Sequence, residues 1–359
     1  MPTRRSFLAA AGAAQAAAAQ RKPVVQSPYP LSTAKAQGDP IRIVTYRDLE
    51  PDEVRKIEAA APNVNVTVCR TRDEFNEKSR EAEVIIGEIG GDALRSATKL
   101  KWLQVSGAGV EWMDPTLRES PVVVTNCART FAPGITETGI GLLLCLTRGI
   151  STYYMPQFYK HRMVPVGNPR SADHIELAGK TMGIVGMGGI GSAMARRAHY
   201  GFEMRVIATD AKPLPKPEYV AELHDPAWFP EMAAQVDVLV AAAPHTPQTE
   251  RMFNARIFRS MRPTAYFLAL SRGKLYDDMA LAQALKEGWI KGAGLDVFPI
   301  EPPPSDHPIF ELSNVVMTPH TSGWSPDRQT RLIDLYAENV RRYANGIPLL
   351  NVVDKQRGY

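Results

Sequence analysis

Short apolar runs alternate with amphipathic stretches along most of this chain. Runs rich in branched and aromatic residues are typical of buried strands, whereas apolar residues spaced three and four apart are typical of helices. Because strand and helix signals alternate, the pattern predicts parallel sheets covered by helices. The strands predicted in the first half are Ile41–Tyr46, Val64–Val68, Val84–Ile86, Trp102–Val105 and Val122–Thr125.

A second series of the same kind begins at Lys180. Between the two series, an apolar segment from Ile135 to about Tyr154 contains no proline and predicts one long helix that connects two domains. An amphipathic helix is predicted from about Pro326 to Ala344. The strands predicted in the second series are Thr181–Val185, Arg205–Thr209, Val236–Ala241, Ala265–Leu270, Gly292–Leu295 and Val315–Met317.

Length and composition agree with two globular α/β domains. A chain of 359 residues is too long for one ordinary core, and 44% hydrophobic with 22% charged residues argues against a disordered or fibrous protein. The formal net charge of +4 gives no reason to expect a nucleic-acid partner. Cys69, Cys127 and Cys145 are widely spaced and fit no zinc or disulfide pattern, so we interpret them as buried thiols.

The first residues resemble an export signal. Arg4 and Arg5 precede Phe7, Leu8 and an alanine-rich run, as in twin-arginine signals. We predict a signal segment over residues 1–19, a linker over 20–40, and an exported, periplasmic protein. The run is too short and too weakly apolar to predict a membrane span. In the alternative interpretation the leader has no targeting role and the protein stays in the cytoplasm.

A glycine-rich loop follows the predicted strand Thr181–Val185. Gly186, Gly188 and Gly191 form G-x-G-x-x-G immediately before a helical pattern. In this motif the first glycine permits the tight turn, the second lets the backbone approach a pyrophosphate, and the third lets helix and strand pack closely. The helix N-terminus then favours the phosphates, so the loop predicts a dinucleotide site.

Asp210 stands at the end of the next predicted strand, about twenty residues beyond the loop. A carboxylate there accepts hydrogen bonds from the ribose hydroxyls of NAD and repels the 2′-phosphate of NADP. We therefore predict NAD as the cofactor, although Lys212 two residues later weakens the discrimination. The alternative is a glycine-rich turn in a doubly wound protein that binds another ligand.

Three polar residues follow the later strands: Arg272, Glu301 and His320. Each alone has an ordinary interpretation as a loop residue. Because the carboxyl ends of parallel strands share one edge of a sheet, their joint placement downstream of the glycine loop favours an active site. Histidine is the side chain best suited to move protons near neutral pH.

These residues lie in segments that together resemble the signature of the D-isomer-specific 2-hydroxyacid dehydrogenases. The resemblance covers about residues 41–350 in the right order. It implies an oxidoreductase that transfers a hydride between NAD(H) and a 2-hydroxy or 2-keto acid, with D-isomer specificity. The matching segments are Ser106–Val110, Glu176–Thr181, Leu270–Gly273, Gly294–Phe298, Glu301–Pro302 and Thr318–His320.

The resemblance also implies residue roles. His320 is the acid/base group, Glu301 fixes its tautomer and favours the imidazolium, and Arg272 binds the substrate carboxylate and polarises the carbonyl. The backbone of Gly107, Ala108 and Gly109 binds the other end of that carboxylate. Asp296 lies near the nicotinamide amide. The cofactor contacts expected are Gly186, Gly188, Gly189, Ile190, Gly191, Asp210, Pro244, Leu270, Ser271, Asp296 and Gly323.

The predicted fold is therefore two Rossmann- or flavodoxin-like parallel-sheet domains. Residues 40–139 and 324–359 form a discontinuous substrate domain, and residues 140–323 form an inserted NAD-binding domain. We expect a homodimer, to which the helix from Ile135 contributes. The remaining histidines show no metal-ligand spacing, so no metal is expected.

Substrate identity stays open among glyoxylate, hydroxypyruvate, pyruvate and bulkier 2-keto acids. Glu301 argues against formate, since the formate dehydrogenases of this family carry an amide at that position. Trp112 and Trp324 are candidates for shaping the pocket. The alternative function is a non-enzymatic NAD-binding sensor or partner-binding protein on the same scaffold, as in the corepressor branch of the family.

Overall fold

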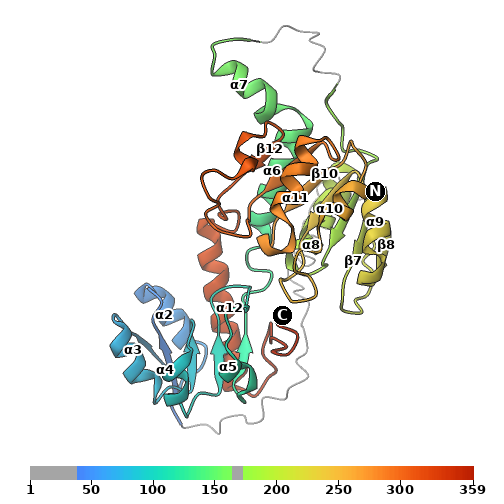
Figure 1. Cartoon of the computed structure of the whole chain (residues 1–359). Coiled ribbons are helices and arrows are strands. Elements are labelled where there is room, and N and C mark those ends of the chain that lie inside the picture. The colour runs from blue at the N-terminus through green and yellow to red at the C-terminus, as the bar shows by residue number, and fades with distance from the viewer. Residues whose placement is uncertain (1–38, 164–172) are drawn as a thin grey trace, which may run out of the picture. The chain divides into compact units, whose positions relative to one another are not determined.

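The computed structural model describes residues 39–163 and 173–359 (Figure 1). The predicted signal segment and most of the predicted linker lie outside the described residues. The described chain forms two compact units. Unit 1 holds the residues up to Gln104, with Pro121–Thr125 and Leu335–Val353. Unit 2 holds Val105–Ser120, Asn126–Asp334 and Asp354–Tyr359.

Unit 1 is built on a five-stranded parallel sheet of order β2-β1-β3-β4-β5, the order of flavodoxin-like folds. Its strands are β1 (Ile41–Thr45), β2 (Val64–Val68), β3 (Val84–Ile86), β4 (Trp102–Gln104) and β5 (Val123–Thr125). The helices that follow the first three strands are α2 (Pro51–Glu58), α3 (Arg72–Ser79) and α4 (Gly91–Ser96). The five strands predicted from the apolar runs are confirmed.

Helix α12 (Pro326–Ala344) contributes to the core of unit 1 through its second half. The ring of Tyr343 stacks on that of Trp102, with centroids 5.4 Å apart, and its hydroxyl donates to Glu83 Oε1 at 2.6 Å. Burial, reinforced by the Glu83 carboxylate, raises the pKa of Tyr343 far above its ordinary value. The phenol therefore stays a hydrogen-bond donor inside the core.

Unit 2 contains a seven-stranded parallel sheet of order β12-β11-β10-β9-β6-β7-β8. The order reverses at β6, which pairs with β7 on one side and β9 on the other, and ligands of such sheets bind at this switch point. The short edge strand β8 was not predicted, because its sequence Glu-Leu-His carries no apolar run. The strands are β6 (Thr181–Val185), β7 (Arg205–Thr209), β8 (Glu222–His224), β9 (Val238–Ala241), β10 (Tyr266–Ala269), β11 (Gly292–Leu295) and β12 (Val315–Met317).

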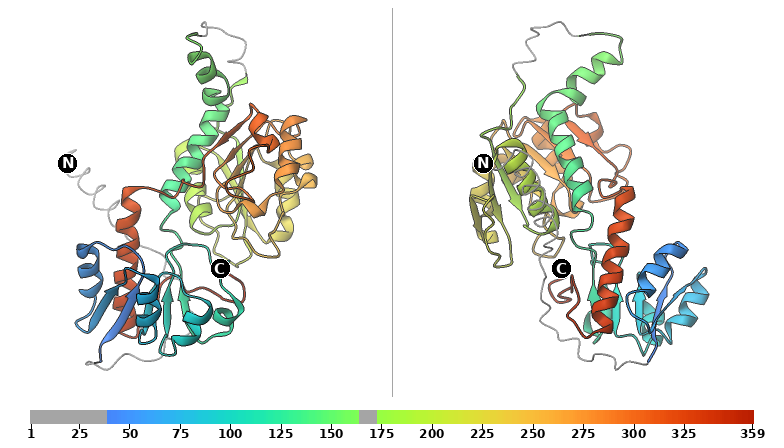
Figure 2. Two further views of the ribbon diagram at one scale, coloured as in Figure 1. Left: turned by 60° about the vertical axis from the view of Figure 1, so that its left-hand side comes forward. Right: turned by 180° about the vertical axis from the view of Figure 1, so that it is seen from behind.

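Helices cover both faces of this sheet (Figure 2). Apolar residues of α6 and α8 pack with Ile184 and Val240 on one face. Those of α9, α10 and α11 pack with Leu239 and Phe267 on the other. This layering is that of a doubly wound α/β domain. The helices of unit 2 are α5 (Pro115–Glu119), α6 (Ala132–Thr147), α7 (Met155–Phe158), α8 (Gly189–Phe202), α9 (Phe229–Gln235), α10 (Ala255–Ser260) and α11 (Asp278–Lys286).

The prediction of a single helix from Ile135 to Tyr154 is wrong. Helix α6 ends at Thr147, and Gly149 takes a left-handed conformation with φ of +65°. The carbonyl of Thr147 accepts from the Ile175 N–H, which ends the helical ladder. A π-helical segment, Ile150–Tyr154, and α7 follow. A glycine readily adopts this helix-ending geometry, which an apolar run without proline does not reveal.

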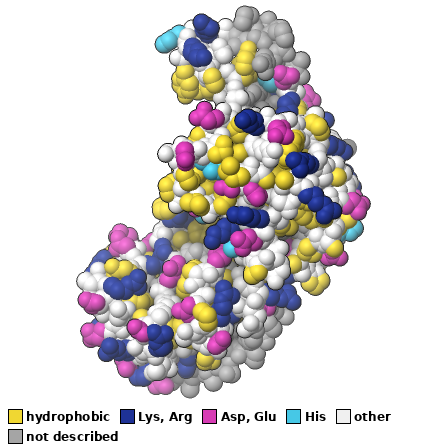
Figure 3. All heavy atoms as spheres, in the orientation of Figure 1, with side chains coloured by type: hydrophobic (Ala, Val, Ile, Leu, Met, Phe, Trp, Pro, Cys, Tyr) yellow, Lys and Arg dark blue, Asp and Glu magenta, His cyan; other side chains and the backbone are white. Residues whose placement is uncertain are grey.

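Acidic and basic side chains are intermixed over the described residues of the face in Figure 3. Among the helices of residues 39–163 and 173–359, none has the length and apolarity needed to cross a bilayer.

Candidate active site

The glycine loop joins β6 to α8 at the switch point of the seven-stranded sheet. Gly186 has a φ of +95°, and a Cβ atom there would lie 2.7 Å from the Ala243 backbone. A Cβ atom on Gly191 would lie 1.9 Å from the Gly186 carbonyl oxygen. At Gly188 it would meet nothing within 4 Å. Two glycines are thus required by the turn and the packing, while Gly188 leaves the backbone open for a ligand to approach.

Gly191→Ala is expected to distort the loop. The added methyl group overlaps the Gly186 carbonyl, so the strand and the first turn of α8 must separate. We expect NADH affinity, measured by quenching of protein fluorescence, to fall about tenfold or more. Gly201→Ala, at a helical glycine whose Cβ atom would meet nothing within 4 Å, is the control. Unchanged affinity in Gly191→Ala would contradict the assignment of the loop.

Asp210 follows β7 and lies against the loop. Its Oδ2 accepts from the Met187 N–H and its Oδ1 from the Lys212 N–H, each at 2.7 Å. The carboxylate is therefore fixed beside the second residue of the motif. Burial lowers the pKa of the Lys212 ammonium, with Asp210 opposing that shift. One anion and one cation thus stand together at the end of β7.

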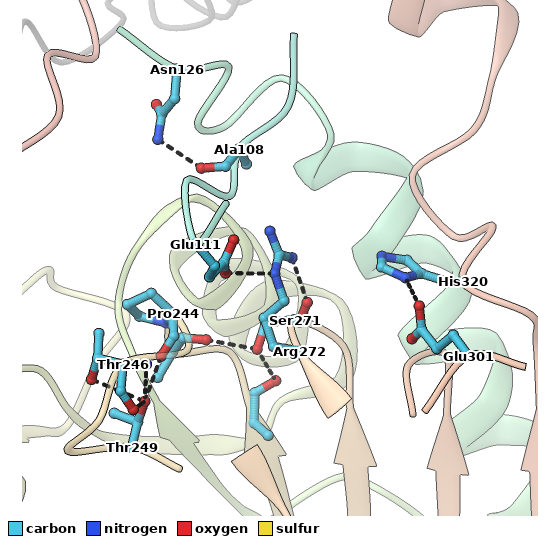
Figure 4. Close-up of polar contacts among 12 residues, drawn as sticks. Ala108, Glu111, Asn126, Pro244, Thr246, Thr249, Ser271, Arg272, Glu301 and His320 are labelled. Carbon is cyan, nitrogen blue, oxygen red and sulfur yellow. Dashed lines mark hydrogen bonds and ion pairs between the residues drawn. The ribbon is translucent and has the colours of Figure 1, made fainter. Parts of the chain in front are cut away.

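His320 and Glu301 form a hydrogen-bonded pair (Figure 4). Imidazole Nδ1 lies 2.7 Å from Glu301 Oε2, and Glu301 Oε1 accepts from the Phe298 N–H at 2.8 Å. A carboxylate is an acceptor, so Nδ1 carries the proton in this pair. That leaves Nε2 as the ring nitrogen available to exchange a proton with a ligand. The His320 side chain is 46% exposed, so a ligand can reach it.

Asp296 fixes the segment that carries His320. Its carboxylate is buried and accepts from the Thr318 hydroxyl at 2.7 Å and from the N–H groups of Thr321 and Ser322 at 3.1 Å. The Ser322 hydroxyl also donates to it, and the His320 N–H donates to the Asp296 carbonyl. Because several donors bind one buried carboxylate, the segment that carries His320 is held rigidly. The role near the nicotinamide stays a prediction.

Arg272 follows β10, one strand away from the strand that leads to Glu301. Its Nη1 donates to the Ser271 carbonyl at 2.7 Å, and its Nε donates to Glu111 Oε1 at 2.8 Å. The next residue must be glycine, since a Cβ atom on Gly273 would lie 1.8 Å from the Phe298 carbonyl carbon. This close approach holds the Arg272 strand end against the segment that leads to Glu301.

The loop Gly107–Gly109 lies beside Arg272. Its carbonyl groups are held from behind, that of Gly107 by the Cys127 N–H and that of Ala108 by Asn126 Nδ2, each at 2.8 Å. A Cβ atom on Gly109 would lie 1.9 Å from Arg272 Nη2. The guanidinium therefore packs directly on the α-carbon of Gly109.

Three further predicted cofactor residues, Pro244, Leu270 and Ser271, lie at the ends of β9 and β10. The Ser271 hydroxyl donates to the Ala243 carbonyl at 2.8 Å, which joins these two strand ends. The Pro244 carbonyl accepts from the Thr249 hydroxyl at 2.8 Å, so the loop after β9 is internally braced (Figure 4). Leu270 is buried, with its side chain toward Gly139 of α6.

The structure thus gathers most predicted residues at one sheet edge and adds others. It hydrogen-bonds His320 to Glu301, and it places Arg272 against the Gly107–Gly109 loop. Ile190 lies in the first turn of α8, and Gly323 lies beside Phe131. No polar contact given for either residue defines a role. Residues that the sequence analysis missed are Glu111, Asn126, Arg129 and Ser322. Thr318 was part of a matching segment, but its hydrogen bond to Asp296 was not predicted.

Arg129 is a further cation at the glycine loop. Its backbone lies against Gly189, where a Cβ atom would come within 2.8 Å of the Arg129 α-carbon. Burial lowers the pKa of its guanidinium.

Within residues 39–163 and 173–359, no group of three or more His, Cys, Asp or Glu is arranged to hold a metal ion.

A dinucleotide loop at the switch point, with a His–Glu pair and an arginine at the ends of neighbouring strands, defines a nicotinamide-dependent oxidoreductase. Residues 140–322 match the model for the D-isomer specific 2-hydroxyacid dehydrogenase NAD binding domain. The chain belongs to this family. The glyoxylate reductase of Korarchaeum cryptofilum is 30% identical over 305 residues, which are 83% of this chain and 88% of that protein.

Two further proteins agree with this assignment. The D-3-phosphoglycerate dehydrogenase of Methanocaldococcus jannaschii is 30% identical over 88% of this chain, and the chain spans 59% of its length. A D-isomer specific 2-hydroxyacid dehydrogenase from Xanthobacter autotrophicus, solved with NADPH and MES, superposes with a TM-score of 0.76. It is 27% identical and covers 89% of this chain and 99% of that one. The chain is therefore an NAD(P)-dependent dehydrogenase of the 2-hydroxyacid family.

Proposed function

We propose that this protein reduces a small 2-keto acid to the D-2-hydroxy acid with NADH, and catalyses the reverse oxidation. The observation that carries the proposal is the 2.7 Å bond between His320 and Glu301, formed at the same sheet edge as the glycine loop. That bond leaves Nε2 to exchange a proton with the substrate oxygen. Because glyoxylate reductases are among the relatives of this chain, we propose a small substrate such as glyoxylate.

The loop residues fit a dinucleotide. The space at Gly188 and the constrained turn at Gly186 are what a pyrophosphate at the start of α8 requires. The residues that would hold the cofactor are those of the loop Gly186–Gly191, with Asp210 at the ribose and the β9 and β10 ends along the nicotinamide half. When bound, the nicotinamide supplies or accepts the hydride.

The chain's own residues do the rest. Arg272 and the N–H groups of the Gly107–Gly109 loop bind the substrate carboxylate, because a guanidinium fork matches carboxylate geometry. His320 donates a proton from Nε2 to the keto oxygen in reduction and takes it back in oxidation. Glu301 orients the imidazole ring and stabilises its positive charge. The Phe298 N–H in turn fixes Glu301 by donating to its Oε1.

The test is NADH oxidation with a panel of glyoxylate, hydroxypyruvate, pyruvate and phenylpyruvate. We expect turnover with at least one, fastest with the smaller acids. Firm NADH binding without turnover of any 2-keto acid would contradict the enzyme and favour the NAD-binding sensor. Formate with NAD is the negative control, since Glu301 replaces the amide expected in formate dehydrogenases.

We propose NAD rather than NADP as the preferred cofactor. The Asp210 carboxylate stands fixed at the end of β7, where it repels a 2′-phosphate. Asp210→Ser is expected to raise the ratio of kcat/KM for NADPH to that for NADH by about tenfold or more, since Lys212 then lacks its opposing charge. A ratio that stays constant would contradict this role. Asp225→Ser, which removes an aspartate from the start of a short helix after β8, is the control.

Two proposals concern the assembly and location of the protein. We propose a homodimer, which light scattering tests directly, with a monomer as the contradicting result.

We also propose export through the twin-arginine-like leader with the cofactor already bound, since free NAD is expected to be scarce outside the cytoplasm. An Arg4→Lys, Arg5→Lys variant retained in the cytoplasm supports export, and unchanged location contradicts it.

A further inference from the structure

We propose that Glu111 competes with the substrate for Arg272 and thereby selects small monocarboxylate substrates over dicarboxylates. The inference rests on the proposed function, because it assigns Arg272 to the substrate carboxylate. Glu111 and Arg272 are 161 residues apart in sequence, and both lie in unit 2.

The contact is a well-formed ion pair. Arg272 Nε lies 2.8 Å from Glu111 Oε1, and the two side chains are 31% and 32% exposed. Two-thirds of each side chain is thus removed from water, which strengthens the attraction above that of a fully exposed pair. The remaining exposure leaves Glu111 a route to swing into solvent.

The Glu111 carboxylate also lies where the substrate carboxylate is expected. A Cβ atom built on Gly109 would lie 1.9 Å from Arg272 Nη2 and 2.3 Å from Glu111 Oε2. The guanidinium and the carboxylate therefore share the space directly over the Gly109 α-carbon, between the arginine and the Gly107–Gly109 loop. Figure 4 shows Glu111 on the loop side of Arg272, facing its guanidinium.

This placement has consequences for affinity. Arg272 Nη1 is held by the Ser271 carbonyl, so a substrate carboxylate reaches the fork at Nε and Nη2. The Nε–H is the group that Glu111 occupies. Two anions do not share one N–H group favourably, so substrate binding includes the release of Glu111. The measured KM then contains the free energy of that ion pair.

The charge of Glu111 also affects which 2-keto acids bind. After release, Glu111 remains two residues from Gly109 and keeps its negative charge beside the bound substrate. A 2-keto acid with a neutral side group tolerates that charge, whereas the second carboxylate of oxaloacetate or 2-ketoglutarate is repelled by it. The chemical class that fits is a monoanionic 2-keto acid.

The test compares wild type with Glu111→Gln and Glu111→Asp. In both variants we expect KM for glyoxylate to fall about threefold or more, because the charge is lost or the shorter chain no longer reaches Arg272. The value of kcat should change less than about twofold. In Glu111→Gln, kcat/KM for oxaloacetate relative to pyruvate should rise about threefold or more. Glu81→Gln, which removes a carboxylate of exposed ion pairs in unit 1, is the control.

A raised KM, or a kcat lowered tenfold, would overturn the proposal and make Glu111 a residue that positions Arg272. Unchanged constants in Glu111→Gln would overturn it as well. Binding of oxamate to the NADH-loaded protein, measured by calorimetry, separates this inference from the proposed function. If wild type turns over no 2-keto acid, the proposed function fails, yet tighter oxamate binding by Glu111→Gln still supports the competition.

Discussion

His320→Ala is expected to lower kcat by about 100- to 10,000-fold while NADH affinity changes less than about twofold. The substitution removes the only ring nitrogen that we assign to proton exchange. The glycine loop lies at the start of α8 and does not depend on that ring. Steady-state NADH oxidation and fluorescence titration measure the two quantities separately.

Two variants make this result specific. Glu301→Gln keeps the size of the side chain but removes the charge that pairs with Nδ1. We expect it to lower kcat by less than His320→Ala does. His161→Ala changes an exposed histidine after α7 and should have no effect. Turnover that survives His320→Ala would show that another group moves the proton.

Arg272→Ala is expected to raise KM for the 2-keto acid about 100-fold or more, with KM for NADH nearly unchanged. The substitution removes the fork that binds the substrate carboxylate and leaves Glu111 unpaired in the same space. Both effects weaken substrate binding. Steady-state kinetics with each substrate varied in turn measure the split.

Arg272→Lys is the matched variant, because it keeps the charge but cannot bind a carboxylate through two parallel N–H groups. It should recover only part of the lost affinity. The double variant Arg272→Ala, Glu111→Gln should bind the substrate better than Arg272→Ala alone, since the repelling carboxylate is gone. Equal loss of affinity for NADH and 2-keto acid would indicate general damage to the strand end rather than a carboxylate site.

Local patterns predicted the glycine loop and the strands well. The motif from Gly186 to Gly191 consists of neighbours in sequence, so it is visible without the fold. The close contacts of Gly186 with Ala243 and of Gly189 with Arg129 are added by the fold. Short buried strands such as β6 and β11 follow directly from apolar runs. The end of α6 at Thr147 was not predicted, because the apolar run continues past Gly149. The Ile175 N–H that binds the Thr147 carbonyl is also distant in sequence.

The candidate site was predictable only where a signature connects distant segments. The pairing of His320 with Glu301 came from such a signature, and the 2.7 Å contact agrees with it. Glu111 and the hydrogen bonds to the Asp296 carboxylate were not predicted. Their contacts join segments that no periodicity relates, so only the folded sheet edge reveals them.

The most direct test of the account follows the hydride itself. The protein is incubated with NADH deuterated at C4, using each of the two C4 epimers in turn. The substrate is the best of pyruvate, hydroxypyruvate and phenylpyruvate, because glycolate from glyoxylate has no stereocentre at C2. The account predicts that one epimer places deuterium on C2 of a D-2-hydroxy acid, and that His320→Ala nearly abolishes this transfer. An L product, or cofactor oxidation that places no deuterium at C2 with either epimer, would contradict it.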